Sequence, residues 1–227
     1  CRIIGVRDLD DLIEQTIPAA VRRDLPLDLP DGKLGEAGSL ALIKSILAEN
    51  VIAKNFIGMG YHGTIVPGTI SRNLLENPGW YTAYTPYQAE ISQGRLESLV
   101  NFQTLVCELT GMEVANASLL DEGSAAAEAM AMIARTVNSK VKNQFFVSEH
   151  VHPQSIEVMQ TRAHYFGMEL IIGDHRTTDF VNMPKLCGAL VQYPDTSGKL
   201  NDFSGVASAL HKNGAHLVVA ADPLALV

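Results

Sequence analysis

The chain has 227 residues, of which 47% are hydrophobic and 19% are charged, and its formal net charge is −8. This length and composition are typical of a globular chain with one large or two small domains. The acidic balance and the lack of a clustered Lys/Arg run argue against binding to nucleic acid or to an anionic membrane. No apolar run approaches the length of a membrane span.

Three widely spaced cysteines, Cys1, Cys107 and Cys187, form no CxxC pattern. The sequence therefore predicts neither a disulfide framework nor a zinc site, and it favours a reducing compartment. Cys107 falls among the apolar positions of an expected helix, so we expect its thiol to be buried.

The first third of the chain has the apolar spacing of a helical arm. Residues 24–38 are rich in Pro, Gly and Asp and are expected to form a loop. The predicted helices are residues 8–17, a helix that Ser39 caps and that carries an apolar stripe from Leu42 to Leu47, and a helix that starts after Pro67 and runs to Pro78.

Residues 79–94 form an aromatic segment that is neither a good helix nor a central strand, because Pro and Gly interrupt it. The segment contains the only tryptophan and three of the six tyrosines. Two interpretations remain open. In the first, the segment plugs a large internal surface. In the second, polar side chains line a site for a small polar substrate, namely Tyr84, Thr85, Tyr87, Gln88, Glu90, Ser92 and Gln93.

From residue 92 onward the pattern predicts an α/β domain. Ser92 is expected to cap a helix that runs to about Leu109, and Gly111 is expected to end it. Beyond Asn143, short apolar runs alternate with helical segments, which indicates βαβ units and a parallel sheet with helices on both faces. The remaining expected elements are an extended link or strand at 114–119, strands at 145–147, 170–172, 189–192 and 217–220, and helices at 125–137, 153–166 and 203–212.

Ligands of such sheets bind at the carboxyl ends of the strands. This rule selects His150 and His152 after the first strand, the run Tyr193-Pro194-Asp195 after the third, and Asp222 after the last. His152 either lies against a planar cofactor ring, acts as an acid or base, or bonds to the backbone of its loop. Asp222 either pairs with a protonated ring nitrogen or caps the next element, and capping is favoured.

Gly123 and Ser124 open the alanine-rich helix, so their N–H groups either bind a phosphate or are capped by Asp121. The carboxylates of Asp121 and Glu122 would repel a phosphate dianion, which favours capping. The sequence has no GxGxxG after a strand, no GxSxG, no HExxH and no P-loop, so the mechanisms of those motifs have no support.

Several stretches together resemble the N-terminal half of the glycine cleavage system P-protein family, glycine dehydrogenase (aminomethyl-transferring). They are residues 9–14, 56–61, 74–80, 84–97, 115–123 and 192–195, and the resemblance covers essentially the whole chain in order. It implies an α/β fold of the aspartate-aminotransferase type, pyridoxal-phosphate fold type I. Residues 1–91 would be an α-helical N-terminal arm with the aromatic segment, and residues 92–227 a large domain with a mainly parallel sheet, truncated at the C-terminus.

The resemblance implies an oxidoreductase that uses pyridoxal 5'-phosphate to decarboxylate glycine and passes the aminomethyl group to the lipoyl H-protein. The Schiff-base lysine is expected in a C-terminal half or second subunit. The chain stops at Val227, just past a strand-like run, and we expect it to be a fragment that is inactive alone. We expect no nucleic-acid partner, no membrane partner and no bound metal.

The resemblance also suggests roles for the site residues. It implies that four catalytic residues line a site which the missing half completes, namely Tyr84, Thr85, Tyr87 and Gln88. Relic positions of a lost cofactor site would be Gly123, Ser124, His152 and Asp222.

Two alternative functions remain open. One is a non-catalytic module that assembles the protein and docks the lipoyl carrier. The other is a different fold-type-I pyridoxal-phosphate decarboxylase with a cofactor of its own. Proteins of this family would lie in the mitochondrial matrix of a eukaryote or in the cytoplasm of a bacterium.

Overall fold

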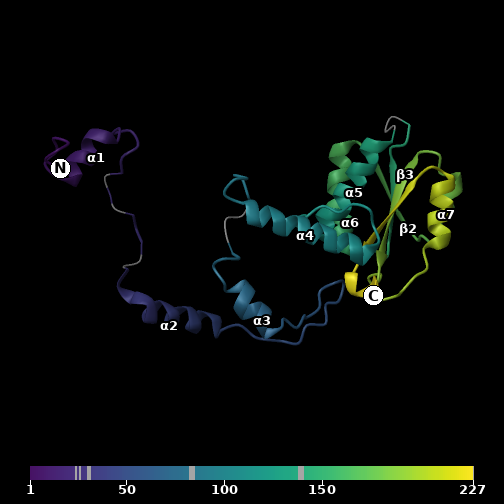
Figure 1. The fold of residues 1–227 in the computed structure, drawn as a ribbon, viewed down its shortest axis with the longest axis horizontal. Coiled ribbons are helices and arrows are strands. Elements are labelled where there is room, and N and C mark those ends of the chain that lie inside the picture. Colours follow the sequence, from purple (N-terminus) through teal and green to yellow (C-terminus); the bar gives the residue numbers. More distant parts are fainter. Residues whose placement is uncertain (24, 26, 30–31, 82–84, 138–140, 227) are drawn as a thin grey trace. The chain divides into compact units, whose positions relative to one another are not determined.

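The computed structural model describes residues 1–226 except residues 24, 26, 30–31, 82–84 and 138–140. The chain forms two compact units, Cys1–Lys54 and Asn55–Val227. Figure 1 labels most of their helices and two of the strands of the second unit. The expected division between residues 91 and 92 falls within the second unit and stays a prediction.

The described part of the first unit contains α1 (Leu9–Thr16), the short 3-10 helix η1 (Gly32–Leu34) and α2 (Gly35–Leu47). The helix predicted at 8–17 is confirmed, and the carboxylate of Asp8 caps it by accepting the N–H of Asp11 at 2.8 Å. The prediction that Ser39 caps the second helix is wrong, because α2 already begins at Gly35. The preceding 3-10 turn supplies the first helical turn, so the glycines at 35 and 38 do not delay the start.

The second unit begins with helices that lie outside the sheet. α3 (Gly68–Ile70) continues into the π-helical turn η2 (Ser71–Leu75), and α4 (Gln93–Thr110) ends at Gly111, whose φ is 70°. These helices confirm the predictions for both regions, although Ser92 makes no side-chain capping bond and residues 114–119 form a link rather than a strand. In the described part of the chain, no helix is long and apolar enough to cross a membrane.

Cys107 of α4 is only partly buried, which corrects the expectation of a buried thiol. The reason is that α4 has no buried residue within the described part of this chain. The buried thiol is instead that of Cys187, and burial raises its pKa.

The described strands form a four-stranded parallel sheet in the order β2-β1-β3-β4. The strands are β1 (Gln144–Ser148), β2 (Glu169–Gly173), β3 (Leu186–Tyr193) and β4 (His216–Ala221). The helices around them are α5 (Glu122–Thr136), α6 (Pro153–Phe166) and α7 (Ser204–Lys212), with short 3-10 turns η3 (Phe180–Asn182) and η4 (Pro223–Leu226). The predicted parallel sheet with βαβ units is therefore confirmed.

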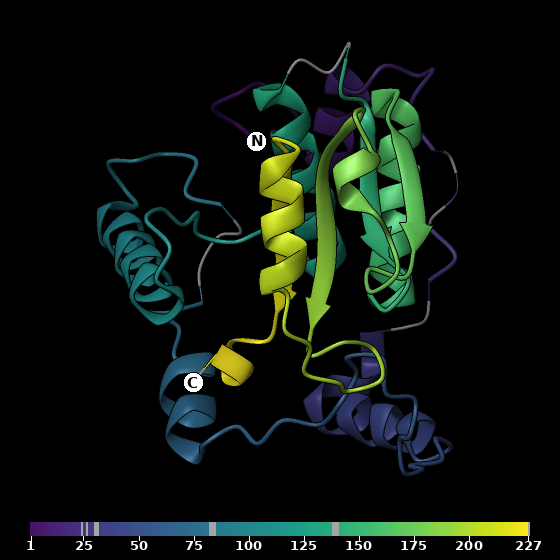
Figure 2. The same ribbon diagram turned by 90° about the vertical axis from the view of Figure 1, so that its right-hand side faces the viewer.

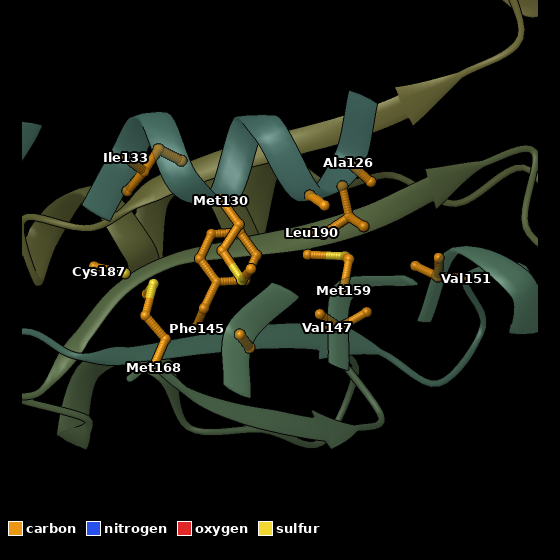
Figure 3. Packing of buried hydrophobic residues seen from close by; sticks show 12 residues of the cluster. Ala126, Met130, Ile133, Phe145, Val147, Val151, Met159, Met168, Cys187 and Leu190 are labelled. Carbon is orange, nitrogen blue, oxygen red and sulfur yellow. The ribbon is translucent and has the colours of Figure 1, made fainter. Parts of the chain in front are cut away.

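Helices cover both faces of the sheet (Figure 2) because successive side chains of a strand point to opposite sides. Phe145 of β1 packs with Met130 of α5 and Met159 of α6 on one face, and Figure 3 shows these side chains converging. The next residue, Phe146, packs with Leu210 of α7 on the other face. Each large side chain buried in this way contributes about 1.5–3 kcal/mol.

The loop after β3 is closed by the buried carboxylate of Asp195. Its Oδ1 accepts hydrogen bonds from the N–H groups of Ser197 and Lys199 at 2.8 and 3.0 Å. Its Oδ2 accepts one from the side-chain amide of Asn201 at 3.1 Å. Burial raises the pKa of this carboxyl, but the hydrogen bonds outweigh burial and lower the pKa of Asp195 to about 2. The loop is therefore held by an ionised group at neutral pH.

Gly188 of β3 leaves no room for a side chain. A Cβ there would lie 2.8 Å from Cε2 of Phe145, 3.1 Å from the carbonyl oxygen of His216 and 3.2 Å from Cδ1 of Ile133. Because the sheet backbone cannot easily give way, Gly188→Ala should lower the free energy of unfolding by about 1–3 kcal/mol in chemical denaturation. Gly205→Ala is the matched control, since a Cβ at Gly205 meets no atom within 4 Å. Equal loss of stability in both variants would contradict this packing.

Asp195→Asn keeps the shape of the loop residue and removes its charge. The amide protons of Ser197 and Lys199 should exchange at least about tenfold faster near neutral pH, because a hydrogen bond to a charged group contributes about 1.5–3 kcal/mol. The folded pKa lies below the ordinary value of 3.8, so the stabilisation is present above that value and is lost as the pH falls towards about 2. Hydrogen exchange should therefore show the two proteins converging over that interval, and a constant difference would disprove the role of the charge.

Candidate functional site

A cavity of about 640 Å³ lies at the carboxyl ends of β3 and β4, where the parallel sheet predicts a ligand site. Of the predicted strand-end residues, His152, Pro194, Asp195 and Asp222 line it. His150 and Tyr193 do not belong to its described lining. The remaining wall comes from the segment around Gly60 and His62 and from the start of α5, and the apolar part includes Leu190 and Val218.

His152 is buried at the start of α6 and forms one wall of the cavity. Its Nδ1 lies 3.0 Å from Oγ1 of Thr196, so the partner is a loop hydroxyl and not a backbone group. Its Nε2 has no hydrogen-bond partner among the described residues. Gly60 lies against this edge of the ring: with φ at 86°, a Cβ on it would come within 2.8 Å of Nε2. Only glycine allows the chain to approach the ring so closely.

The N-terminus of α5 is capped by a carboxylate, which takes one N–H group and disfavours a phosphate there. Oδ1 of Asp121 accepts the backbone N–H of Ser124 at 2.7 Å, and this bond lowers the pKa of the Asp121 carboxyl. Gly123 serves close packing of α5 on α6, since a Cβ there would lie 3.2 Å from Cγ2 of Val158. The capping interpretation is therefore confirmed. Glu122, which follows Asp121 and lines the cavity, places a second carboxylate near the same helix N-terminus.

Asp222 caps the turn that follows β4, as the favoured interpretation predicts. Its Oδ1 accepts the N–H of Leu224 at 2.9 Å, and its own N–H donates to the carbonyl oxygen of Tyr193 at 2.9 Å. No lysine or arginine is among the described residues that line the cavity, whereas Glu122 is. The cavity therefore carries negative charge and does not fit the phosphate of pyridoxal phosphate.

The aromatic segment contributes nothing to the described lining of this cavity. Tyr84 lies outside the described residues, and the structure brings none of its neighbours Thr85, Tyr87 and Gln88 to the cavity. Thr85 is partly buried, while Tyr87 is 85% exposed and Gln88 is exposed as well. The described aromatic side chains therefore do not plug an internal surface of this chain.

Gln192, which no sequence pattern selected, lines the cavity at the end of β3. Its side chain is only 7% exposed, yet its amide forms no hydrogen bond with any described residue. Gln192 lies two residues after Leu190 and so faces the same side of the sheet. A polar residue at an inward-facing strand position is the signal that the sequence offered.

A second polar cluster lies at the ends of β1 and β2, and of its members only His150 was selected from the sequence. The guanidinium of Arg176 donates to Asp174 at 2.8 Å and lies 3.0 Å from Nε2 of His150. Possible ligand atoms of Glu149, His150 and Asp174 lie within 4.8 Å of one another. Arg176 already supplies the positive charge there, and its hydrogen bonds hold the pKa of Asp174 well below the usual range.

Comparison with known proteins gives a consistent result. The sequence model of the family described as "Glycine cleavage system P-protein" matches residues 1–227. A "Glycine dehydrogenase (decarboxylating)" of Nostoc sp. is 53% identical over 224 residues, which is 99% of this chain and 22% of that protein. The protein of the same name from Akkermansia muciniphila is 54% identical over 98% of this chain and 23% of that protein.

The fold is similar to a solved crystal structure of glycine decarboxylase (P-protein) of the glycine cleavage system in inhibitor-bound form. The TM-score is 0.82 at 33% sequence identity, and the match covers 99% of this chain and 51% of that one. This similarity confirms the predicted fold class. The chain spans only 22–23% of the length of the two relatives named above. Its sequence and its fold both show that the chain belongs to the glycine cleavage system P-protein family.

Proposed function

We propose that this chain is the N-terminal part of a glycine dehydrogenase (decarboxylating). The complete protein would decarboxylate glycine and transfer the aminomethyl group to the lipoyl H-protein. The observation that carries this proposal is the family match over the full length of the chain. The relatives named above are bacterial, which supports a cytoplasmic location if the source is a bacterium.

The proposed cofactor is pyridoxal 5'-phosphate, which supplies an electron sink for carbanion chemistry. Its lysine would lie outside this chain, in a C-terminal half or second subunit. Three features of the cavity support this assignment: Asp121 occupies the helix N-terminus, Glu122 and Asp222 bring negative charge, and no lysine is among the described lining residues. These features agree with relic status for Gly123, Ser124, His152 and Asp222.

The contribution of this chain to the reaction would come from the aromatic segment, that is from Tyr84, Thr85, Tyr87 and Gln88. Its described part forms a turn in which the N–H of Tyr87 donates to the carbonyl oxygen of Thr85 at 2.9 Å. The carbonyl oxygen of Gln88 accepts the N–H of Ser92 at 3.2 Å, which joins the turn to the start of α4. The phenol and amide groups remain exposed and are suited to orienting the carboxylate of glycine.

A role in assembly is the second candidate function. One observation favours it: α4 presents large apolar side chains to solvent, including Val100, Leu105 and Leu109, which are 58%, 49% and 54% exposed. Exposed apolar surface of this kind is typical of interaction sites. The alternative of a decarboxylase with its own cofactor in this cavity has less support, because the cavity does not fit a phosphate.

Tyr87→Phe and Gln88→Leu test the proposed active-site role in the complete protein. Each should lower the release of CO2 from carboxyl-labelled glycine by about 10- to 100-fold, because a hydrogen bond to a charged substrate group contributes about 1.5–3 kcal/mol. Stability should not change, since both side chains are exposed. Tyr165→Phe and Gln160→Leu, at exposed positions of α6, are the matched controls.

Two outcomes separate the parts of this proposal. Normal turnover in both variants would rule out the role of the aromatic segment. Absence of glycine decarboxylation in the complete wild-type protein, supplied with pyridoxal phosphate and lipoylated carrier, would rule out the function itself.

A further inference from the structure

We propose that the cavity at the ends of β3 and β4 binds a small organic cation, an amine that also carries a polar group able to pair with an amide. The inference rests on the cavity alone and does not depend on the proposed function.

Gln192 has a side-chain amide without a partner among the described residues. An amide that is buried away from protein partners is satisfied by water or by a ligand, and a ligand group that pairs with it can replace that water. Among the described residues, no fully enclosed side-chain nitrogen or oxygen lacks a partner. Since Gln192 lines the cavity and is 7% exposed, its amide must open into that space. The amide offers a bound molecule one acceptor and two N–H donors.

His152 adds a second hydrogen-bonding group to the same wall. Its Nδ1 is taken by Thr196, and its Nε2 has no described partner while the residue lines the cavity. The ring is 7% exposed, so the position of Nε2 is set by the protein and not by solvent. Two buried polar side chains, Gln192 of β3 and His152 at the start of α6, thus line one space and each has an atom without a described partner.

The negative charge of the cavity wall favours a cationic ligand over an anionic one. Glu122 and Asp222 line it, and no lysine or arginine does so among the described residues. Asp222 has only its Oδ1 occupied, by the N–H of Leu224. In contrast, both carboxylate oxygens of Asp195 accept hydrogen bonds from its own loop. An anionic ligand would be repelled by this wall, whereas an ammonium group would be attracted.

The cation is organic and not a metal ion. Ligand atoms of Glu122, His152 and Asp222 do not form a metal-sized group; within the described residues, the one such group is Glu149, His150 and Asp174. The floor of the cavity includes Leu190, Val218 and Ala126, which suits a hydrocarbon body. A volume of about 640 Å³ lies within the range of about 300–1,000 Å³ of small-molecule sites.

L-Leucinamide is the probe, because it combines an ammonium, a branched apolar side chain and a primary carboxamide. Titration calorimetry on the complete protein should show saturable binding to one site per chain. Two matched compounds separate the contributions: 2-hydroxy-4-methylpentanamide lacks the charge, and 3-methylbutylamine lacks the amide. Each should bind at least about tenfold more weakly, since about 1.4 kcal/mol corresponds to a factor of ten. No saturable leucinamide binding, or equal binding of the uncharged compound, would overturn the proposal.

Substitutions of lining residues test whether leucinamide binds in the cavity. Gln192→Met keeps the volume and removes the amide, so leucinamide binding should weaken about tenfold or more. The free energy of unfolding should stay the same or rise, because no protein partner is lost. Asp222→Asn should weaken binding about three- to tenfold, and Gln160→Met on the exposed face of α6 should change nothing. Unchanged binding in Gln192→Met, or a clear loss of its stability, would refute the assignment. Glycine decarboxylation is measured separately, so failure of the proposed function remains distinguishable.

Discussion

Thr196 joins the two loops on which the candidate site depends. Its backbone N–H donates to the carbonyl oxygen of His150 at 2.9 Å, and its hydroxyl lies 3.0 Å from Nδ1 of His152. The preceding residue, Asp195, closes its own loop with an ionised carboxylate. Tyr193 then accepts the N–H of Asp222 after β4. Three chain segments that are distant in sequence are thereby fixed at one edge of the sheet.

This edge is the usual ligand site of a parallel α/β sheet, but its chemistry differs from that of a phosphate site. Phosphate binding at a helix N-terminus needs free N–H groups and positive charge. Here Asp121 takes the N–H of Ser124, and Glu122 and Asp222 make the wall acidic. The fold is therefore that of a phosphate-binding sheet, whereas the acidic wall of this cavity attracts cations and repels anions.

The aromatic segment and α4 differ from the sheet in how they use their apolar side chains. The sheet region buries Phe145 and Phe146 completely between helices, whereas Trp80 and Tyr87 remain 60% and 85% exposed. Exposed aromatic groups have little value for the stability of this chain. Within the described residues, these aromatic groups belong to the surface of the chain, which spans 22% of the length of its Nostoc relative.

The amino-acid sequence by itself determined the local elements. The helix at 153–166 begins and ends where the pattern predicts, because Pro153 and Gly167 act on the adjacent backbone. The capping by Asp121 and Asp222 was equally predictable, since a cap involves residues two or three positions apart. The family resemblance carried by residues 84–97 was likewise sufficient to predict the fold. The roles of Tyr84, Thr85, Tyr87 and Gln88 remain predictions.

Only the tertiary structure decided which groups meet. The approach of Gly60 to His152, the unpaired amide of Gln192 and the partial exposure of Cys107 all depend on segments far apart in the chain. Hydrophobic periodicity tells which face of a strand is buried, but not what lies opposite it. The start of α2 at Gly35 instead of Ser39 has a similar cause, because a preceding turn outweighed the local preference of glycine. Contacts between distant residues decide such cases, and sequence spacing does not encode them.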